Sequence, residues 1–205
     1  KEDEYKYFER SLKSTVPRRR PLFYVNPKLH KKPYSTRPVV SCVNSTPEIF
    51  SIWVDYWLKQ LTHLAKSYLR DSTQAVEELK AIGRLPPGTR MFTADAVSMY
   101  TNIDTQHGIT TIRNFLLQHK DELPFAFPSD LLVEVLKEIM TNNIFDFGDT
   151  HWIQLSGTAM GTSCACMYAT LCYAHHENNN IIPQYSNRLK YYRRFIDDGT
   201  GTWVP

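Results

Sequence analysis

The feature that most constrains the fold is a hairpin signature near the C-terminal end of the chain. Two β-rich runs, Lys190–Ile196 and Thr200–Val204, flank the short segment Asp197-Asp198-Gly199. An Asp-Gly pair between such runs is a strong signal for a tight turn. A third run, Met91–Val97, alternates like a strand but lies far upstream. The sequence therefore predicts an α+β fold whose strands are distant from one another along the chain.

Helical segments are predicted around these runs because apolar residues recur at three- and four-residue spacing. The first opens at Thr46-Pro47-Glu48, where a threonine N-cap precedes a proline at the first helical position. The expected elements are helices from Thr46 to about Leu69, from Ser72 to Gly83, over Asp104–His119, from Ser129 through Ile139 and from Thr162 to about Asn178, with a hairpin of Ile144–Phe147 and His151–Gln154 turning at Gly148-Asp149.

The first forty residues differ from the rest in charge and in proline content. They hold 11 Lys/Arg against 4 Asp/Glu, whereas the whole chain has a net charge of only +3. Five prolines from Pro17 to Pro38 argue against a long helix there and favour short extended segments. This basic arm is therefore an electrostatic feature of its own.

Composition excludes several classes of protein. With 42% apolar and 13% aromatic residues among 205, the chain can bury a core as one domain or two small lobes, which argues against disorder. No window approaches the roughly 18 apolar residues of a membrane-spanning helix, which predicts a soluble protein. The four cysteines are too few and too clustered for a disulfide framework, which favours a reduced, intracellular setting. The end residues Lys1 and Pro205 suggest cuts through a longer protein.

Three aspartates form the first candidate site. Asp197 and Asp198 lie in the expected hairpin turn, and Asp95 lies in an apolar strand, where an unpaired carboxylate would be costly. Oxygen donors from two strands suit Mg²⁺, and two such ions can stabilise the attacking and leaving oxygens of a phosphoryl transfer. Taken alone, Asp-Asp-Gly is more commonly a solvated turn, and the third carboxylate is what favours a metal site.

The basic arm matches that chemistry. Lys28, Lys31, Lys32 and Arg37 are candidates to hold phosphates, because arginine makes bidentate contacts and lysine acts as a point charge. A basic run is more often nonspecific surface charge. The absence of any acidic residue between Arg10 and Pro47 favours a phosphate-facing surface instead.

Four motifs, in order, resemble those of one family of polymerases. They read PKLHKKPYSTRPVVS from Pro27, FTADAVSMYTNI from Phe92, QLSGTAMGTSCACMYATLCY from Gln154 and YYRRFIDDGTGTW from Tyr191. Together they look like the successive fingers and palm motifs of reverse transcriptases and are most similar to the Penelope-like retroelement group. The motif sequences SMYTNI, GTAMGTS and PKLHKKP with RPVVS are far more specific for this family than a pair of aspartates is.

The resemblance implies a right-hand polymerase fold with fingers and palm only, built on an antiparallel palm sheet with packed helices. Residues 1–90 would form the fingers, with the basic arm and a long Trp-rich helix, and residues 91–205 the palm with the three aspartates; the thumb would be absent. The implied activity is that of an RNA-directed DNA polymerase of a retroelement. It would use two Mg²⁺ ions, which Mn²⁺ can replace, with an RNA template, a DNA primer and dNTP, in the nucleus.

The resemblance also assigns roles to residues of the aspartate motifs. Asp95 and Asp197 would bind both metals, Asp198 would complete the set, and the backbone carbonyl of Ala96 would be a further ligand. Tyr100 falls where such polymerases place the aromatic ring that packs under the sugar and excludes a ribose 2′-hydroxyl. Without the resemblance, Tyr100 would be interpreted as a core aromatic residue.

Other motif positions are assigned by the resemblance to the nucleotide or to the template and primer. Arg37 falls where the fingers hold the incoming triphosphate, with Lys31 or Lys28 as a second cation. The glycines would let the backbone approach the template base and the nucleotide closely. The nucleotide-binding set is Arg37, Lys31, Lys28, Tyr100 and Gly161, and the template or primer set is Gly157, Gln154, Arg18, Arg19 and Arg20. The three arginines fit a nuclear import signal equally well.

Alternatives remain for the cysteines and for the function. Cysteine and histidine side chains, which can bind zinc, lie close together in the sequence at Cys164, Cys166, Cys172, His175 and His176. However, Cys-x-Cys is not a usual structural zinc spacing, so small buried residues are the favoured interpretation. An RNA-directed RNA polymerase shares the aspartates with the main hypothesis, and so does a catalytically inactive nucleic-acid-binding relic of a polymerase fold.

Overall fold

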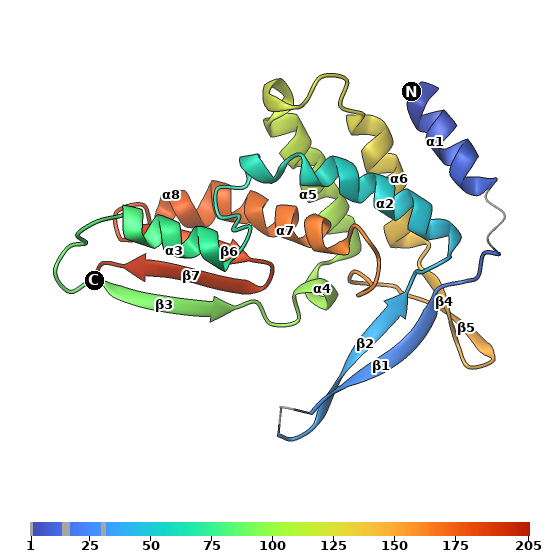
Figure 1. The fold of residues 1–205 in the computed structure, drawn as a ribbon, viewed down its shortest axis with the longest axis horizontal. Coiled ribbons are helices and arrows are strands. Elements are labelled where there is room, and N and C mark those ends of the chain that lie inside the picture. The colour runs from blue at the N-terminus through green and yellow to red at the C-terminus, as the bar shows by residue number, and fades with distance from the viewer. Residues whose placement is uncertain (1, 14–16, 30–31) are drawn as a thin grey trace.

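The computed structural model describes residues 2–13, 17–29 and 32–205, which form a helical body, a projecting ribbon and a separate sheet (Figure 1). The helices are α1 (Glu2–Leu12), α2 (Thr46–Lys59), α3 (Ser72–Ala81), α4 (Met99–Asn102), α5 (Thr105–Gln118), α6 (Ser129–Thr141), α7 (Ala165–His176) and α8 (Ile182–Gln184), with short turns η1 (Thr62–Leu64) and η2 (Lys120–Glu122) and the π-helical η3 (Glu177–Ile181). The strands are β1 (Leu22–Lys28), β2 (Ser35–Ser41), β3 (Arg90–Asp95), β4 (Ile144–Phe147), β5 (Thr150–Ile153), β6 (Leu189–Phe195) and β7 (Asp198–Trp203).

Four helices enclose the hydrophobic core. α2, α5, α6 and α7 pack against one another, and each contributes a side chain that is fully excluded from solvent, namely Leu58, Phe115, Leu136 and Tyr168. Burying a side chain of this size stabilises the fold by about 1.5–3 kcal/mol. The helical body is therefore the support on which the strands are placed. Within the described ranges, no helix is long and apolar enough to cross a membrane.

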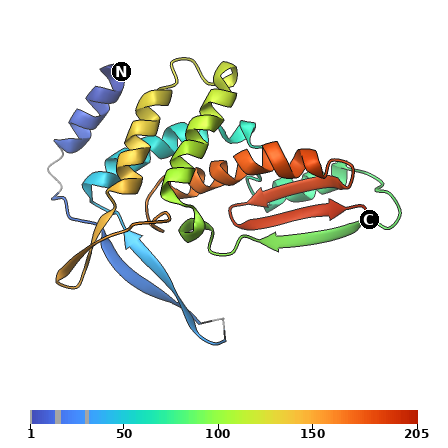
Figure 2. The same ribbon diagram turned by 180° about the vertical axis from the view of Figure 1, so that it is seen from behind.

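A three-stranded sheet, in the order β3-β7-β6, lies beside this helical body (Figure 2). All of its pairings are antiparallel, and β3 joins β7 from Arg90 opposite Trp203 to Asp95 opposite Asp198. The sequence prediction of an α+β fold with pairing between distant strands is confirmed. The second sheet has the order β2-β1-β4-β5, and its β1–β2 part projects from the helical body as a ribbon (Figure 1).

The first predicted helix is shorter than expected. α2 ends at Lys59 rather than near Leu69, and after η1 a turn leads to a single bridge between Tyr68 and Arg194 of β6. There the Arg194 N–H donates to the Ser67 carbonyl at 2.6 Å, and the Leu69 N–H donates to the Arg194 carbonyl at 3.0 Å. These residues satisfy backbone groups at the outer edge of β6, which they could not do as part of a continued helix.

Helix starts also differ from the predictions. Ser45 and not Thr46 is the N-cap of α2, and α7 begins at Ala165 instead of Thr162, whereas α6 begins at Ser129 as predicted. The basic arm contains the eleven-residue helix α1, which the proline argument did not predict. That helix ends before Pro17, so the prolines restrict only the segment that follows it.

Candidate active site

The sheet brings the three aspartates to one end of the β3–β7 pair. Asp95, the last residue of β3, is directly opposite Asp198, the first residue of β7. Directly opposed residues of antiparallel strands have Cβ atoms about 4.5–5.5 Å apart on the same face of the sheet. The Ala96 N–H donates a 2.9 Å hydrogen bond to the Asp197 carbonyl, which ties the third aspartate to the end of β3.

The turn of this hairpin is not the predicted Asp-Asp-Gly segment. Ile196 and Asp197 form the turn, while Asp198 and Gly199 already belong to β7. Ile196 has a φ of +55°, in the left-handed region that a β-branched residue rarely adopts. Such a conformation costs about 1–3 kcal/mol, so surrounding contacts must hold it. The shift matters because it places Asp198 in register with Asp95.

The three carboxylates are exposed, and none has a hydrogen bond or an ion pair within the part of the chain that the structure describes. The prediction that Asp95 lies within a buried strand is wrong, because β3 is an edge strand whose side chains are mostly exposed. Like charges directly opposite each other destabilise a strand pair, so a cation would relieve Asp95 and Asp198.

The aspartates offer oxygen atoms that can bind a metal ion, but whether their side chains are arranged around one point is a separate question. Among residues 2–13, 17–29 and 32–205, no group of three or more His, Cys, Asp or Glu side chains is arranged to hold a metal ion. Cys42, Cys164 and Cys172 are buried and Cys166 is half-buried, which fits their interpretation as small packing residues. The aspartate side chains do not converge on one point in this structure. The three aspartate carboxylates are exposed and have no partner among the described residues, and such oxygen donors are the ligands that Mg²⁺ prefers.

Tyr100 lies on α4 and is half-buried. Burial raises the pKa of its phenol, and the neighbouring Cys166 and the Asp197 carboxylate raise that pKa further. The phenol is therefore neutral at physiological pH. Tyr100 also packs against the hydrophobic core, and its role at the sugar of the nucleotide stays a prediction.

The loop between β5 and α7 connects two parts of the site through its glycines. The Thr158 N–H donates to the Tyr100 carbonyl at 2.7 Å, and a Cβ on Gly157 would lie 2.8 Å from the Cα of Thr101. At the other end, the Val40 N–H donates to the Met160 carbonyl at 2.8 Å. Because Gly157 and Gly161 both have positive φ, the loop can contact α4 and the ribbon strand β2 at once.

Comparison with known proteins gives no match by sequence: no family model and no curated protein matches the chain. Solved structures do match in fold. Telomerase from Candida tropicalis, in complex with a fragment of telomeric RNA, aligns over 100% of this chain with a TM-score of 0.67 at 9% identity. The RNA-dependent RNA polymerase of a human picobirnavirus aligns over 90% with a TM-score of 0.65 at 12% identity. The chain has a polymerase-like fold.

The match covers only part of each of these proteins. The chain spans 39% of the Candida tropicalis telomerase chain and 36% of the picobirnavirus polymerase. An RNA polymerase complex inside a double-stranded RNA virus aligns with 98% of the chain, at a TM-score of 0.59 and 10% identity, and the chain covers 19% of it. At such low identity the similarity establishes the fold alone.

Within this polymerase-like fold, the predicted nucleotide-binding cations lie on the β1–β2 ribbon. Arg37 is exposed on β2 and stands in register with Asn26 of β1, and Lys28 ends β1 half-buried. Neither cation has a hydrogen bond or an ion pair to another described residue, which leaves both free to bind an anion. Lys31 lies outside the described residues.

The residues predicted to contact template or primer other than Gly157 have partners within the chain. Arg18 donates to the carbonyls of Ser11 and Ser45 at 2.5 and 3.2 Å. The remaining contacts are those of Arg19 with the Val43 carbonyl at 3.0 Å, of Arg20 with Asp146 at 3.7 Å, and of Gln154 with Asn143 and the Ser156 carbonyl, both at 2.9 Å. Arg18 thus links the backbone at Ser11 to the backbone at Ser45. Contact of these residues with a template stays a prediction.

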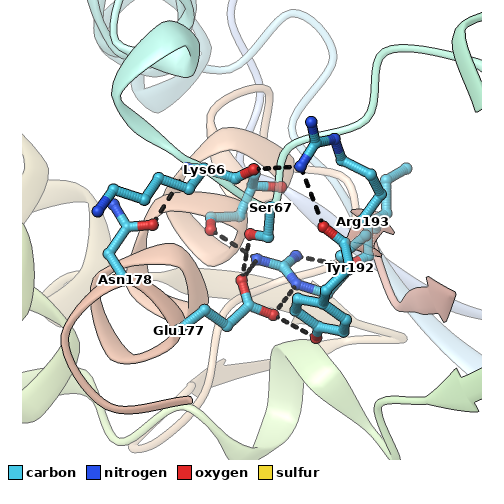
Figure 3. A network of polar contacts seen from close by, with 9 residues as sticks. Lys66, Ser67, Glu177, Asn178, Tyr192 and Arg193 are labelled. Carbon is cyan, nitrogen blue, oxygen red and sulfur yellow. Dashed lines mark hydrogen bonds and ion pairs between the residues drawn. The ribbon is translucent and has the colours of Figure 1, made fainter. Parts of the chain in front are cut away.

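Sequence reasoning missed a buried ion pair behind the hairpin. Arg194 of β6 and Glu177 of η3 are only 3% and 5% exposed, and the Arg194 Nε–Glu177 Oε1 distance is 2.7 Å. Figure 3 shows Glu177 surrounded by donors, including Ser67 and Tyr192. The run before the aspartates contains two adjacent arginines, Arg193 and Arg194, and the sequence does not show which of them is buried.

We expect this ion pair to make stability depend on acidic pH. Burial by itself would raise the pKa of Glu177, but the hydrogen bonds from Arg194, Ser67 and Tyr192 hold it below its ordinary value of 4.5. The stabilisation is therefore complete above pH 4.5 and is lost as the pH falls through the lower, folded-state pKa. Thermal unfolding followed by circular dichroism should show a steeper loss of Tm below that pH than in Glu177→Gln. Parallel pH curves for the two proteins would contradict this prediction.

Proposed function

We propose that the chain carries the nucleotidyl-transfer centre of an RNA-directed DNA polymerase, with residues 1–90 as fingers and residues 91–205 as palm. The observation that carries the proposal is the pairing of Asp95 with Asp198 at the end of β3 and β7, with Asp197 bonded to Ala96, in a polymerase-like fold. Two of the four motifs that resemble those of reverse transcriptases contain these three aspartates. RNA as template, DNA as primer and dNTP as substrate follow from that resemblance.

In the proposed reaction, the primer 3′-hydroxyl attacks the α-phosphate of a dNTP and pyrophosphate leaves. Asp95 and Asp197, with Asp198 and the Ala96 carbonyl, would hold two Mg²⁺ ions, which supply charge stabilisation for the attacking and leaving oxygens. Arg37 and Lys28 on the ribbon would bind the triphosphate, because both are free of partners in the described chain. Gly157 and Gly161 would keep the β5–α7 loop close to the nucleotide.

The test is primer extension by the full-length protein on matched RNA and DNA templates with Mg²⁺ and dNTPs. We expect extension on the RNA template that depends on the divalent ion. Salt-dependent template binding without any incorporation would overturn the proposal and favour a nucleic-acid-binding relic. Activity without added divalent ions would contradict the assigned metal site.

A second candidate, an RNA-directed RNA polymerase, is favoured by the fold similarity to the picobirnavirus enzyme. The two functions differ in sugar choice, for which Tyr100 is the proposed gate. We expect the parent protein to incorporate dNTP in preference to rNTP, and Tyr100→Ala to lose most of that preference by opening space for the 2′-hydroxyl. Competition between dNTP and rNTP measures it, with Tyr100→Phe as the control that keeps the ring. A parent protein that prefers rNTP would support the RNA polymerase.

A further inference from the structure

A buried arginine contacts the turn that carries Asp197. The Arg194 guanidinium donates from Nη1 to the Ile196 carbonyl at 2.7 Å. Its other nitrogens are held elsewhere: Nε and Nη2 donate to the two Glu177 carboxylate oxygens at 2.7 and 2.9 Å, and Nη2 also donates to the Thr170 carbonyl at 3.0 Å. One side chain thus links η3, α7 and the hairpin turn.

The Glu177 carboxylate is itself fixed from several sides. The Tyr192 hydroxyl donates to Oε1 at 2.7 Å, and the Ser67 hydroxyl donates to Oε2 at 2.5 Å (Figure 3). The bidentate pairing with Arg194 adds a planar, directional contact. With both partners almost fully buried, the guanidinium has little freedom to turn away from the hairpin.

The contact with Ile196 bears on Asp197 because a peptide unit is planar. Fixing the Ile196 carbonyl oxygen also fixes the amide nitrogen of Asp197 in the same plane. On the other side, the Ala96 N–H holds the Asp197 carbonyl, and so the next peptide plane. The direction in which the Asp197 side chain leaves the backbone is therefore set by two hydrogen bonds, one of which comes from Arg194.

Ile196 needs such a contact. With a φ of +55°, it adopts a strained conformation that persists only where its surroundings over-determine it. The hydrogen bond from Arg194 is a contact of this kind. Without it, the turn could relax and carry Asp197 away from Asp95.

We propose that Arg194, held by Glu177, is a positioning residue that orients Asp197 for metal binding from behind the hairpin. This inference rests on the proposed function. Outer contacts that orient a metal ligand are typically worth about 10- to 100-fold in metal affinity or activity. Arg194 contacts neither the metal nor the substrate and acts only through the backbone of the turn.

The discriminating variant is Arg194→Lys. Lysine keeps the charge opposite Glu177, but its single ammonium cannot replace the planar fork that reaches Glu177, Thr170 and Ile196 together. Arg193→Lys is the matched control, because Arg193 is adjacent and also ion-paired, to Glu78 at 2.8 Å, yet does not contact the turn. Melting temperature shows whether each variant is folded.

Two physical readouts and one kinetic readout in the full-length protein test the inference, with Asp197→Asn as the reference for loss of the site. Mn²⁺ binding measured by electron paramagnetic resonance should weaken about tenfold or more in Arg194→Lys and remain unchanged in Arg193→Lys. Hydrogen exchange at the Ala96 amide, which reports its bond to the Asp197 carbonyl, should accelerate only in Arg194→Lys. The kcat for dNTP incorporation should fall much more than KM rises.

The outcomes separate this inference from the proposed function. A folded Arg194→Lys with parental Mn²⁺ affinity and parental Ala96 exchange would overturn the positioning role, whatever the activity. A parent protein without primer extension would overturn the proposed function, while the exchange data would still report on the turn. If Arg194→Lys does not fold, Glu177→Gln, which removes the charge but keeps the oxygen acceptor, is measured in the same way and must show the same two effects.

Discussion

Asp197→Asn is expected to abolish primer extension while leaving the fold intact. Asparagine has the same shape but lacks the charge that would hold a divalent ion, so transition-state stabilisation is lost. We expect the rate to fall by about 10³-fold or more, which corresponds to about 4 kcal/mol. Because Asp197 is exposed and its carbonyl, not its side chain, bonds to Ala96, the melting temperature should stay within about 2 °C.

The measurement is single-nucleotide incorporation with saturating template and dNTP, beside the melting curve of the same preparation. Asp121→Asn is the matched control, since Asp121 is an exposed aspartate in η2, remote in the fold from the β6–β7 turn (Figure 1). It should retain parental activity. Equal activity of Asp197→Asn and Asp121→Asn would show that the aspartates are not the metal ligands.

Elements with strong local signals were predictable from the sequence. α5 begins at Thr105, one residue after the predicted start at Asp104, and the Asp104 side chain caps it by accepting a 2.7 Å hydrogen bond from the His107 N–H. The β4–β5 hairpin turns at Gly148, as its Gly-Asp pair predicted. In these cases the cap or turn residue and the apolar spacing on either side indicate the same structure, so the prediction needs no tertiary information.

Elements that depend on distant partners were less predictable. No sequence signal near Lys59 marks the end of α2. The residues beyond it, Ser67 and Leu69, hydrogen-bond to Arg194 of β6, which lies more than 120 residues later in the chain. The turn of the β6–β7 hairpin was misplaced for a related reason. Local sequence rules expect glycine at the position of a tight turn that has a positive φ. Here Ile196 has the positive φ instead, and its carbonyl accepts a hydrogen bond from Arg194.

The candidate site was predictable in its residues but not in its surroundings. Asp95, Asp197 and Asp198 were identified from their chemistry and motif order, and the register of β3 with β7 places Asp95 opposite Asp198. The exposure of Asp95 was mispredicted because apolar neighbours in sequence do not indicate an edge strand. The buried Glu177–Arg194 pair could not be recognised, since its partners meet only when η3 packs behind β6.

Gly161→Ala is expected to be the most damaging change outside the aspartates. Gly161 has a φ of +121°, and a Cβ there would overlap the carbonyl of Val40 on β2. The substitution therefore adds backbone strain of about 1–3 kcal/mol and pushes the loop away from the ribbon. The bond from the Val40 N–H to the Met160 carbonyl would be lost with it. A displacement of about 1 Å near a reacting centre can lower the rate by about 100-fold.

Gly83→Ala separates the two effects of that substitution. Gly83 also has a positive φ, of +72°, but a Cβ there would meet nothing within 4 Å, so this control carries strain without a clash. We expect Gly83→Ala to lower Tm modestly and to keep primer extension, whereas Gly161→Ala should lose about 100-fold or more of its activity. Similar activity losses in the two variants would mean that backbone strain alone is responsible. Only a selective loss in Gly161→Ala, accompanied by faster exchange of the Val40 amide, would show that the ribbon must contact the β5–α7 loop for the site to work.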